Sequence, residues 1–161
     1  MLDQIKKTND YLRRLGPEIQ IVFKLCRDAY HSRFSELETI ITNAFDFARI
    51  VKSLGNDVDS DKVQDLSWLS NQTKMSLTVA SQHFKDESKM LTANEWDSVV
   101  RLCDEVISLE EARQKLLEFL TNRTHVIAPN TSKLVGSAIC AKLIAAAGGL
   151  QELSLMPACN I

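Results

Sequence analysis

The side chains of this chain that could carry chemistry are its histidines, its cysteines and several pairs of adjacent acids. His31, His83 and His125 fall at predicted helix ends or in a loop, and none lies in a Gly-x-Ser-x-Gly, His-x-x-x-His or phosphate-loop context. A histidine in such a place is usually solvated or caps a helix end. We therefore expect no catalytic residue and no enzyme activity.

The acids and cysteines also favour structure over chemistry. Asp104–Glu105 and Glu110–Glu111 are typical of a solvated helix face rather than of an acid–base pair. The chain has four cysteines, Cys26, Cys103, Cys140 and Cys159. None of them has Cys-x-x-Cys spacing, which argues against a metal site. Cys26 and Cys103 fall on apolar stripes, where a thiol behaves as a small hydrophobe. Gly148–Gly149 closes a helix instead of opening one after a strand, so it predicts no nucleotide loop. We expect no metal and no cofactor.

Composition limits the class of protein. The chain has 161 residues, 45% hydrophobic and 25% charged, with a net charge of −2, which is ordinary for a soluble globular protein. This balance excludes a uniformly basic nucleic-acid coat but permits a local RNA-facing patch. Met1–Asp10 is too polar for a signal peptide, so we expect reduced thiols. The most apolar window, 134–150, contains Lys142 and is Ala/Gly-rich, so we expect no membrane partner.

Glycine and proline are scarce, and apolar residues recur at spacings of three and four, which predicts an all-α chain. We predict a helix that begins at Pro17, where the missing N–H costs nothing. Its apolar stripe is Ile19, Val22, Cys26 and Ala29. Ser35 and Glu38 form a capping-box pattern that predicts a second helix, which Gly55 ends. The inner face of this helix is Leu37, Ile41, Ala44, Ala48 and Val51.

An antiparallel helical hairpin is predicted after the polar turn at 56–60. Its first helix covers 62–81, with an interruption near Ser70–Asn71, and 83–90 forms an exposed tip. A capping box at Thr92 and Glu95 begins the second helix. That helix carries a coiled-coil seam: Trp96, Val99, Val100, Cys103, Val106 and Ile107, extended by Leu116, Phe119 and Leu120 after re-capping at Ser108 and Glu111. Between Glu95 and Arg123 stand seven acidic and four basic residues, so this arm is acidic and is not an RNA-binding surface.

The segment 128–161 is rich in small residues. We predict a helix that starts at Pro129–Asn130 with Asn130 as its cap, ends at Gly148–Gly149, and is followed by one more turn that Pro157 stops. Glycine and alanine remove the bulk that keeps backbones apart. Two interpretations remain open: tight packing inside the domain, or a helix that frames a docking surface for a partner.

These residues resemble a known family. The segments that resemble the Nop domain are Asn130-x-Ser132-x-x-Val135-Gly136, Ala141-Lys142-Leu143-Ile144, Ala147-Gly148-Gly149-Leu150 and Pro157-Ala158. Upstream segments resemble the spliceosomal branch of the family, found in the U4/U6 particle: Arg27-Asp28-x-Tyr30-x-x-Arg33-Phe34-x-Glu36-Leu37-Glu38, Asn43 to Phe47, and Val51 to Asn56. The resemblance covers the chain from about Phe23 to its last residue.

The resemblance implies an architecture and a site. The implied fold is an all-α helical bundle with an antiparallel coiled-coil arm, 1–127, plus the N-terminal part of a Nop domain, 128–161, which continues beyond this point in the family. The implied contacts with RNA and protein are Met156, Pro157, Ala158, Cys159 and Asn160. The structural helix motif is Gly136, Ala141, Gly148 and Gly149. Leu155 stands where the family usually has a lysine that would meet a phosphate, so one such contact is expected to be lost.

The function implied by the resemblance is that of a nuclear pre-mRNA splicing factor of the U4/U6 small nuclear ribonucleoprotein (snRNP). Such a protein binds U4 snRNA together with a kink-turn-binding snRNP protein, by shape rather than by base reading. Its helical arm contacts a bridging protein of the tri-snRNP. Two alternatives remain: a helical protein–protein adaptor without RNA binding, and a box C/D small nucleolar ribonucleoprotein scaffold, which Arg33–Phe34 and Cys159 disfavour.

We also expect the end of the chain at Ile161 to leave the helices after Pro129 short of partners. Burial of a leucine or isoleucine side chain contributes about 1.5–3 kcal/mol, so several missing contacts would weaken the fold. A non-native dimer of the fragment, or exchange of segments between copies, would recover part of that burial.

Overall fold

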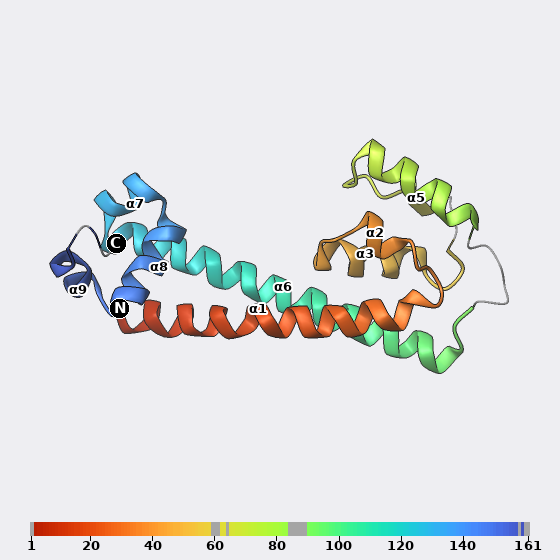
Figure 1. Cartoon of the computed structure of the whole chain (residues 1–161), viewed down its shortest axis with the longest axis horizontal. Coiled ribbons are helices and arrows are strands. Elements are labelled where there is room, and N and C mark those ends of the chain that lie inside the picture. The colour runs from red at the N-terminus through yellow and green to blue at the C-terminus, as the bar shows by residue number, and fades with distance from the viewer. Residues whose placement is uncertain (1, 59–61, 64, 84–89, 158, 160–161) are drawn as a thin grey trace. The chain divides into compact units, whose positions relative to one another are not determined.

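The computed structural model describes residues 2–58, 62–63, 65–83, 90–157 and 159, and within these ranges every regular element is a helix. This confirms the all-α prediction. Figure 1 shows the main helices, which are α1 (Leu2–His31), α2 (Leu37–Ile40), α3 (Ala44–Leu54), α5 (Asn71–His83), α6 (Ala93–Ile127), α7 (Pro129–Val135), α8 (Ser137–Ala147) and α9 (Leu150–Leu155). The chain forms two compact units. We call Met1–Pro17 with Glu111–Ile161 the terminal unit, and Glu18–Glu110 the central unit.

Helix α1 begins at Leu2, so the predicted start at Pro17 is wrong. A proline inside a helix costs about 3 kcal/mol, but burial of apolar side chains on both sides of it outweighs that cost. The buried stripe of α1 is Ile5, Leu15, Ile19, Phe23, Cys26 and Tyr30. Pro17 itself lies on the exposed face, where water can satisfy the carbonyl of Arg13 that lacks its helical partner.

Among the described residues of the central unit, α6 packs against α1 and not against α5. The sulfur atoms of Cys26 and Cys103 lie 3.3 Å apart, and the rings of Tyr30 and Trp96 lie 6.4 Å apart. The two helices are antiparallel, because the higher-numbered residue of α1 meets the lower-numbered residue of α6. The predicted hairpin is therefore wrong, and α5 lies against α2 instead. Of the predicted tip, 84–89 lies outside the described residues.

Helix α5 begins only at Asn71, so most of the stretch 62–70 is not the helix predicted there. The Ser70 hydroxyl accepts a hydrogen bond from the Thr73 N–H at 3.1 Å, which explains the start. Helix α6 is uninterrupted, so the predicted re-capping at Ser108 is wrong. The Ser108 hydroxyl donates to the Glu105 carbonyl at 3.0 Å within the helix and leaves the backbone ladder intact. Val99, Cys103 and Val106 of the predicted seam are buried.

The capping box at the start of α6 is confirmed. The Thr92 N–H donates to the Glu95 carboxylate at 2.8 Å, and the Glu95 N–H donates to the Thr92 hydroxyl at 3.4 Å. The hydrogen bonds from Thr92 lower the pKa of Glu95 below its usual value. The other predicted box is wrong, because Glu36 precedes α2 without a side-chain capping bond. Glu38 pairs instead with Arg27 at 3.2 Å.

The single helix predicted to end at Gly55 is in fact two, α2 and α3. Asn43 separates them and caps α3, since its side-chain oxygen accepts from the N–H groups of Phe45 at 2.9 Å and Asp46 at 3.4 Å. The end at Gly55 is confirmed, with φ +71. Helix α3 contributes six buried side chains to the core of this unit: Ala44, Phe47, Ala48, Ile50, Val51 and Leu54.

The terminal unit is built around the small residues of α8. Two clusters form its core: Ile5, Leu120 and Ala141 with Leu12 and Ile127, and Ala128, Cys140 and Ile144 with Leu150 and Leu153. The side-chain amide of Asn9 donates to the Ala141 carbonyl at 3.0 Å. The side chain of alanine is short enough to let α1 approach the backbone of α8 this closely.

The predicted small-residue helix is broken at Gly136, where φ of +86 separates α7 from α8. Asn130 is not the cap. Ala128 precedes the first turn, because Pro129 takes the first helical position with its fixed φ. The end at Gly148 is confirmed, with a left-handed φ of +91.

Among the described residues, no helix combines the length and the apolar character that a membrane span requires.

Candidate nucleic-acid interface

The candidate interface starts at the turn from α8 into α9. Gly148 adopts the left-handed conformation that ends α8, and Gly149 is extended before α9. A Cβ atom at Gly149 would collide with the carboxylate of Glu152. This carboxylate is the far end of a flexible side chain and can move aside, whereas the left-handed backbone at 148 favours glycine whatever the space around it.

The chain leaves α9 in an extended conformation at Met156, with φ −69 and ψ 138. Pro157 follows and cannot continue a helix, in agreement with the predicted stop. Met156, Pro157 and Cys159 are exposed. Ala158 and Asn160, the other predicted contacts, lie outside the described residues. The described part of the predicted site is therefore an exposed strip that follows the end of α9.

A cavity of about 230 Å³ lies in the terminal unit beside the two glycines. Its lining includes Asp3 and Lys6 of α1 and Ile144 and Ala145 of α8. Pockets for drug-sized ligands usually start near 300 Å³, so this hollow is small for such a ligand. The segment after α8 therefore presents a surface for a macromolecule better than a pocket for a small molecule.

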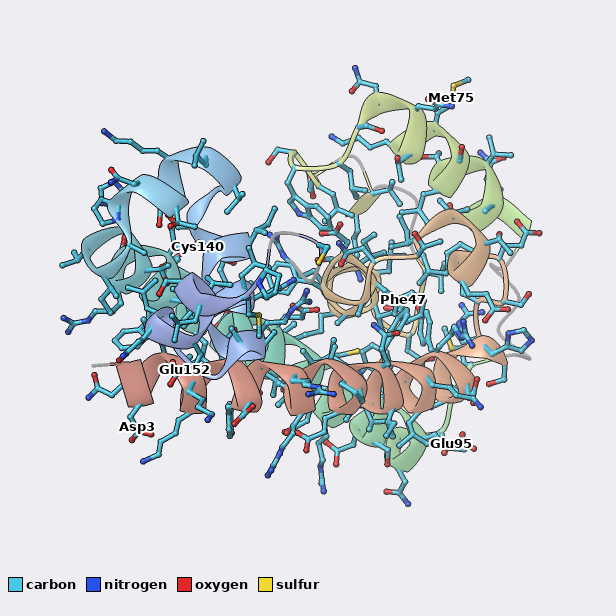
Figure 2. All side chains as sticks on the ribbon, turned by 60° about the vertical axis from the view of Figure 1, so that its left-hand side comes forward. Asp3, Phe47, Met75, Glu95, Cys140 and Glu152 are labelled. Carbon is cyan, nitrogen blue, oxygen red and sulfur yellow. The ribbon has the colours of Figure 1, made fainter. Side chains whose placement is uncertain are left out.

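The predicted helix motif does not form one face. Ala141 is fully buried in α8, Gly136 joins α7 to α8, and Gly148 and Gly149 join α8 to α9. Figure 2 shows Cys140, the neighbour of Ala141, within the terminal unit. Within this motif, Ala141 packs in the core, and the three glycines lie at the junctions where the chain passes from one helix to the next.

The two units have opposite net charge. The terminal unit has nine Lys and Arg against five Asp and Glu, a net of +4, and the central unit has ten against sixteen, a net of −6. Together these give the −2 of the whole chain. The predicted RNA contacts thus belong to the basic unit, while most of the acidic seam helix belongs to the acidic unit.

Large apolar side chains of the terminal unit are exposed after α6. Leu134 is 86% exposed, Ile139 55% and Leu155 77%. Apolar side chains exposed to this extent gain by being covered. Because Leu155 is exposed, packing within the terminal unit does not require a leucine at this position.

The histidines and paired acids, which are predicted from sequence to be solvated or helix-capping residues, lie apart in sequence from the predicted contacts. His31 lies 3.7 Å from Glu38, and His125 is exposed near the end of α6; the side chain of His83 is not described. Asp104 pairs with Lys52 at 2.6 Å. Within the described ranges, no group of three or more His, Cys, Asp or Glu side chains is placed to hold a metal ion.

Two arrangements in the central unit are absent from the sequence predictions. The first is the contact between the thiols of Cys26 and Cys103, which lie 77 residues apart in sequence. The second is the guanidinium of Arg49, 4.3 Å from the ring centre of Trp68 and 5.5 Å from that of Phe45. Phe45 and Arg49 stand four residues apart on α3, so that contact has a local spacing that could have indicated it. The contacts of Cys26 with Cys103 and of Arg49 with Trp68 join segments distant in sequence, and no local spacing indicates them.

Comparison with known proteins adds to this geometry. The family model Nop, described as "snoRNA binding domain, fibrillarin", matches residues 11–161. The U4/U6 small nuclear ribonucleoprotein Prp31 of Xenopus laevis is 36% identical over 159 residues, which cover 98% of this chain and 32% of that protein. The Prp31 homolog of Arabidopsis thaliana is 38% identical over 144 residues, which cover 89% of this chain and 29% of the relative.

A nucleolar relative is also similar. Nucleolar protein 58 of Schizosaccharomyces pombe is 31% identical over 147 residues, which cover 91% of this chain and 28% of that protein. The chain spans about a third of the length of the curated relatives it matches. Because the family model matches nearly the whole chain, the chain belongs to the Nop-domain family.

Proposed function

We propose that the chain acts in a nuclear pre-mRNA splicing factor of the U4/U6 snRNP. Its terminal unit binds U4 snRNA together with a kink-turn-binding snRNP protein, and 128–161 forms the start of the Nop module. The observation that carries this proposal is the exposed strip at Met156, Pro157 and Cys159 in the unit of net charge +4. The higher identity to the U4/U6 relatives than to the nucleolar one supports this branch.

The charge and shape of the terminal unit suit contact with a phosphate backbone. Neutralising phosphates with Lys and Arg releases counterions, which supplies much of the affinity for nucleic acid. The compact side chains of Pro157 and Cys159 in the exposed strip after α9 let the backbone approach the RNA closely. Such contacts read shape and position rather than base sequence, as recognition of a folded RNA stem requires.

The central unit suits a protein partner. Its net charge of −6 repels RNA, and several apolar side chains project from it into solvent: Ile21, Leu25, Met75 and Val79. Figure 2 shows Met75 projecting outward from α5. We assign to this part of the arm, 1–127, the contact with a tri-snRNP bridging protein.

A mobility-shift titration with a U4 kink-turn stem tests the proposal directly. The chain should shift the RNA only when the kink-turn-binding protein is already bound, because the two proteins and the RNA form one composite surface. Binding to a box C/D stem with an affinity similar to that for the U4 stem would favour the nucleolar scaffold. No shift with either stem, with the circular dichroism of a folded chain, would favour the protein-only adaptor.

Replacing Leu155 with lysine should strengthen this ternary complex. The change restores a cation where the Nop family usually has one, and the 77% exposure of Leu155 means that stability should change by less than about 0.5 kcal/mol. We expect the slope of log K against log salt to steepen by about 0.7–0.9, the value for one added phosphate contact.

Leu134→Lys is the matched control, since it adds the same charge to the same unit at a position that is 86% exposed. If both variants steepen the slope equally, the effect is one of net charge and Leu155 does not face a phosphate.

The exposed apolar side chains also support self-association of the isolated chain. Sedimentation velocity should show a monomer–dimer equilibrium that shifts toward monomer in Leu134→Ser, because this change removes the most exposed large apolar side chain. A sedimentation coefficient that does not change with concentration would contradict this prediction.

A further inference from the structure

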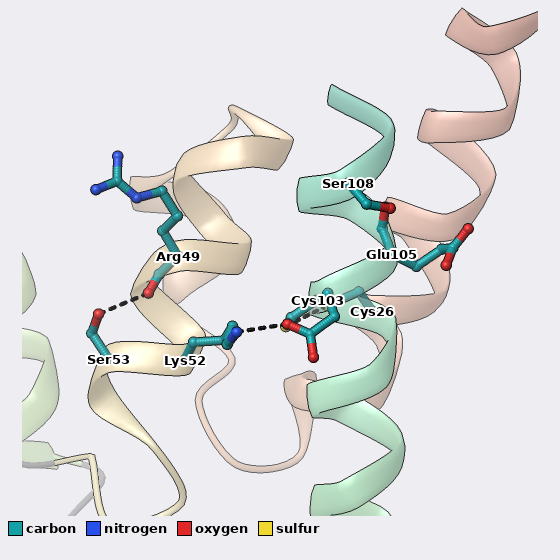
Figure 3. Close-up of polar contacts among 8 residues, drawn as sticks. Cys26, Arg49, Lys52, Ser53, Cys103, Glu105 and Ser108 are labelled. Carbon is teal, nitrogen blue, oxygen red and sulfur yellow. Dashed lines mark hydrogen bonds and ion pairs between the residues drawn. The ribbon is translucent and has the colours of Figure 1, made fainter. Parts of the chain in front are cut away.

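The two thiols of the central unit are placed for a reaction with each other. The sulfur atoms of Cys26 on α1 and Cys103 on α6 lie 3.3 Å apart, and both side chains are fully buried. A disulfide bond is about 2.05 Å long, so the sulfurs need to approach by only about 1.2 Å. Figure 3 shows Cys26 and Cys103 between the two helices, with Lys52 of α3 nearby. Lys52 forms an ion pair with Asp104, the neighbour of Cys103.

We propose that Cys26 and Cys103 are a modification site, at which a peroxide oxidant converts the two thiols into a disulfide that joins α1 to α6 within the central unit. The thiolate of one cysteine attacks one peroxide oxygen, which yields a sulfenic acid and, after uptake of one proton, one water. The thiol of the other cysteine then displaces the hydroxyl group from that sulfur and releases a second water. Each sulfur loses one electron, and the peroxide gains both.

The hydrogen bond between the thiols favours ionisation of one sulfur of the pair. It lowers the pKa of Cys26, while the same bond together with burial raises the pKa of Cys103. The two thiols titrate as a pair, so either sulfur can attack while its neighbour resolves, and both orders give the same disulfide. Because neither sulfur reaches solvent, oxidant enters through local opening of the helices, and the pair reacts more slowly than the exposed Cys159.

The test uses the full chain treated with hydrogen peroxide and then digested with trypsin without reductant. Oxidation should link the peptide 25–27, Leu-Cys-Arg, to the peptide 102–113, which begins Leu-Cys-Asp, with the loss of two hydrogen atoms in mass. Trp68 and Trp96 both belong to the central unit, so tryptophan fluorescence follows its thermal unfolding. Closing a loop of this length should raise the unfolding midpoint by about 5–15 °C, and dithiothreitol should reverse the rise.

Two variants separate the pair from the other cysteines. Cys159→Ala should retain both the linked peptide and the rise in midpoint, and Cys103→Ala should lose both. If Cys103→Ala does not fold, the peptide map of the unmodified sequence still decides the question. The proposal is overturned if the folded chain yields no linked peptide while Cys159 is fully oxidised, or if the link forms only in urea.

Discussion

Replacing Arg33 with alanine is expected to lower the free energy of unfolding of the central unit by about 3–5 kcal/mol. The side chain is fully buried, and its guanidinium donates to the carbonyl oxygens of Asn56 at 2.6 Å and Asp57 at 3.3 Å. Truncation leaves both carbonyls without these donors and opens a void. Urea unfolding followed by tryptophan fluorescence measures the loss, because both tryptophans lie in this unit.

The effect should extend beyond the turn that Arg33 contacts. Asn56 exchanges two hydrogen bonds with the backbone of Leu91, at 2.9 and 3.0 Å, and Leu91 directly precedes the capping box of α6. The turn after α3 thus connects the end of α1 to the start of α6. The resemblance to the spliceosomal branch includes Arg33, and the structure gives this residue a role in the fold rather than at an RNA surface.

Arg27→Ala is the matched control for Arg33→Ala. Arg27 lies near the end of α1, two turns before Arg33, but its ion pair with Glu38 is partly exposed, so its removal should cost less than about 1 kcal/mol. Equal shifts of the urea midpoint in the two variants would show that the hydrogen bonds from Arg33 to the carbonyls of Asn56 and Asp57 do not contribute the expected stability.

Phe47→Ala should destabilise the central unit by a similar amount, about 3–5 kcal/mol. Its ring is 2% exposed and meets the ring of Phe23 edge to face, with 5.4 Å between centroids. This contact joins α3 to α1, and Figure 2 shows Phe47 inside the unit. The same urea titration measures the loss. A double-mutant cycle with Phe23→Ala should yield a coupling of about 0.5–1.5 kcal/mol.

Phe45→Ala is the control, because Phe45 is only half-buried and packs beside the Arg49 side chain at the surface. It should cost about 1 kcal/mol or less. A loss as large as that in Phe47→Ala would mean that the interface of α3 with the rest of the unit is not centred on Phe47.

The family could be recognised from sequence because short motifs carry its local geometry. Gly148 acts through the left-handed φ that its own backbone adopts at the end of α8, and Pro157 acts through the ring that prevents a helix from continuing. The contacts proposed at Met156 and Cys159 could also be predicted from sequence, because they rest on the residue types at these positions of the family motif. Their exposure, and that of Leu155, had to come from the structure.

By itself, the sequence determined the elements that depend on neighbours a few residues apart. Thr92 and Glu95 cap α6, Gly55 ends α3 and Gly148 ends α8, because each acts within one helical turn. The tertiary structure decided which helices meet. It kept α1 continuous through Pro17, placed α6 beside α1 instead of α5, and brought Cys26 to Cys103. These outcomes depend on burial between segments distant in the chain, and such burial outweighs a local preference of a few kcal/mol.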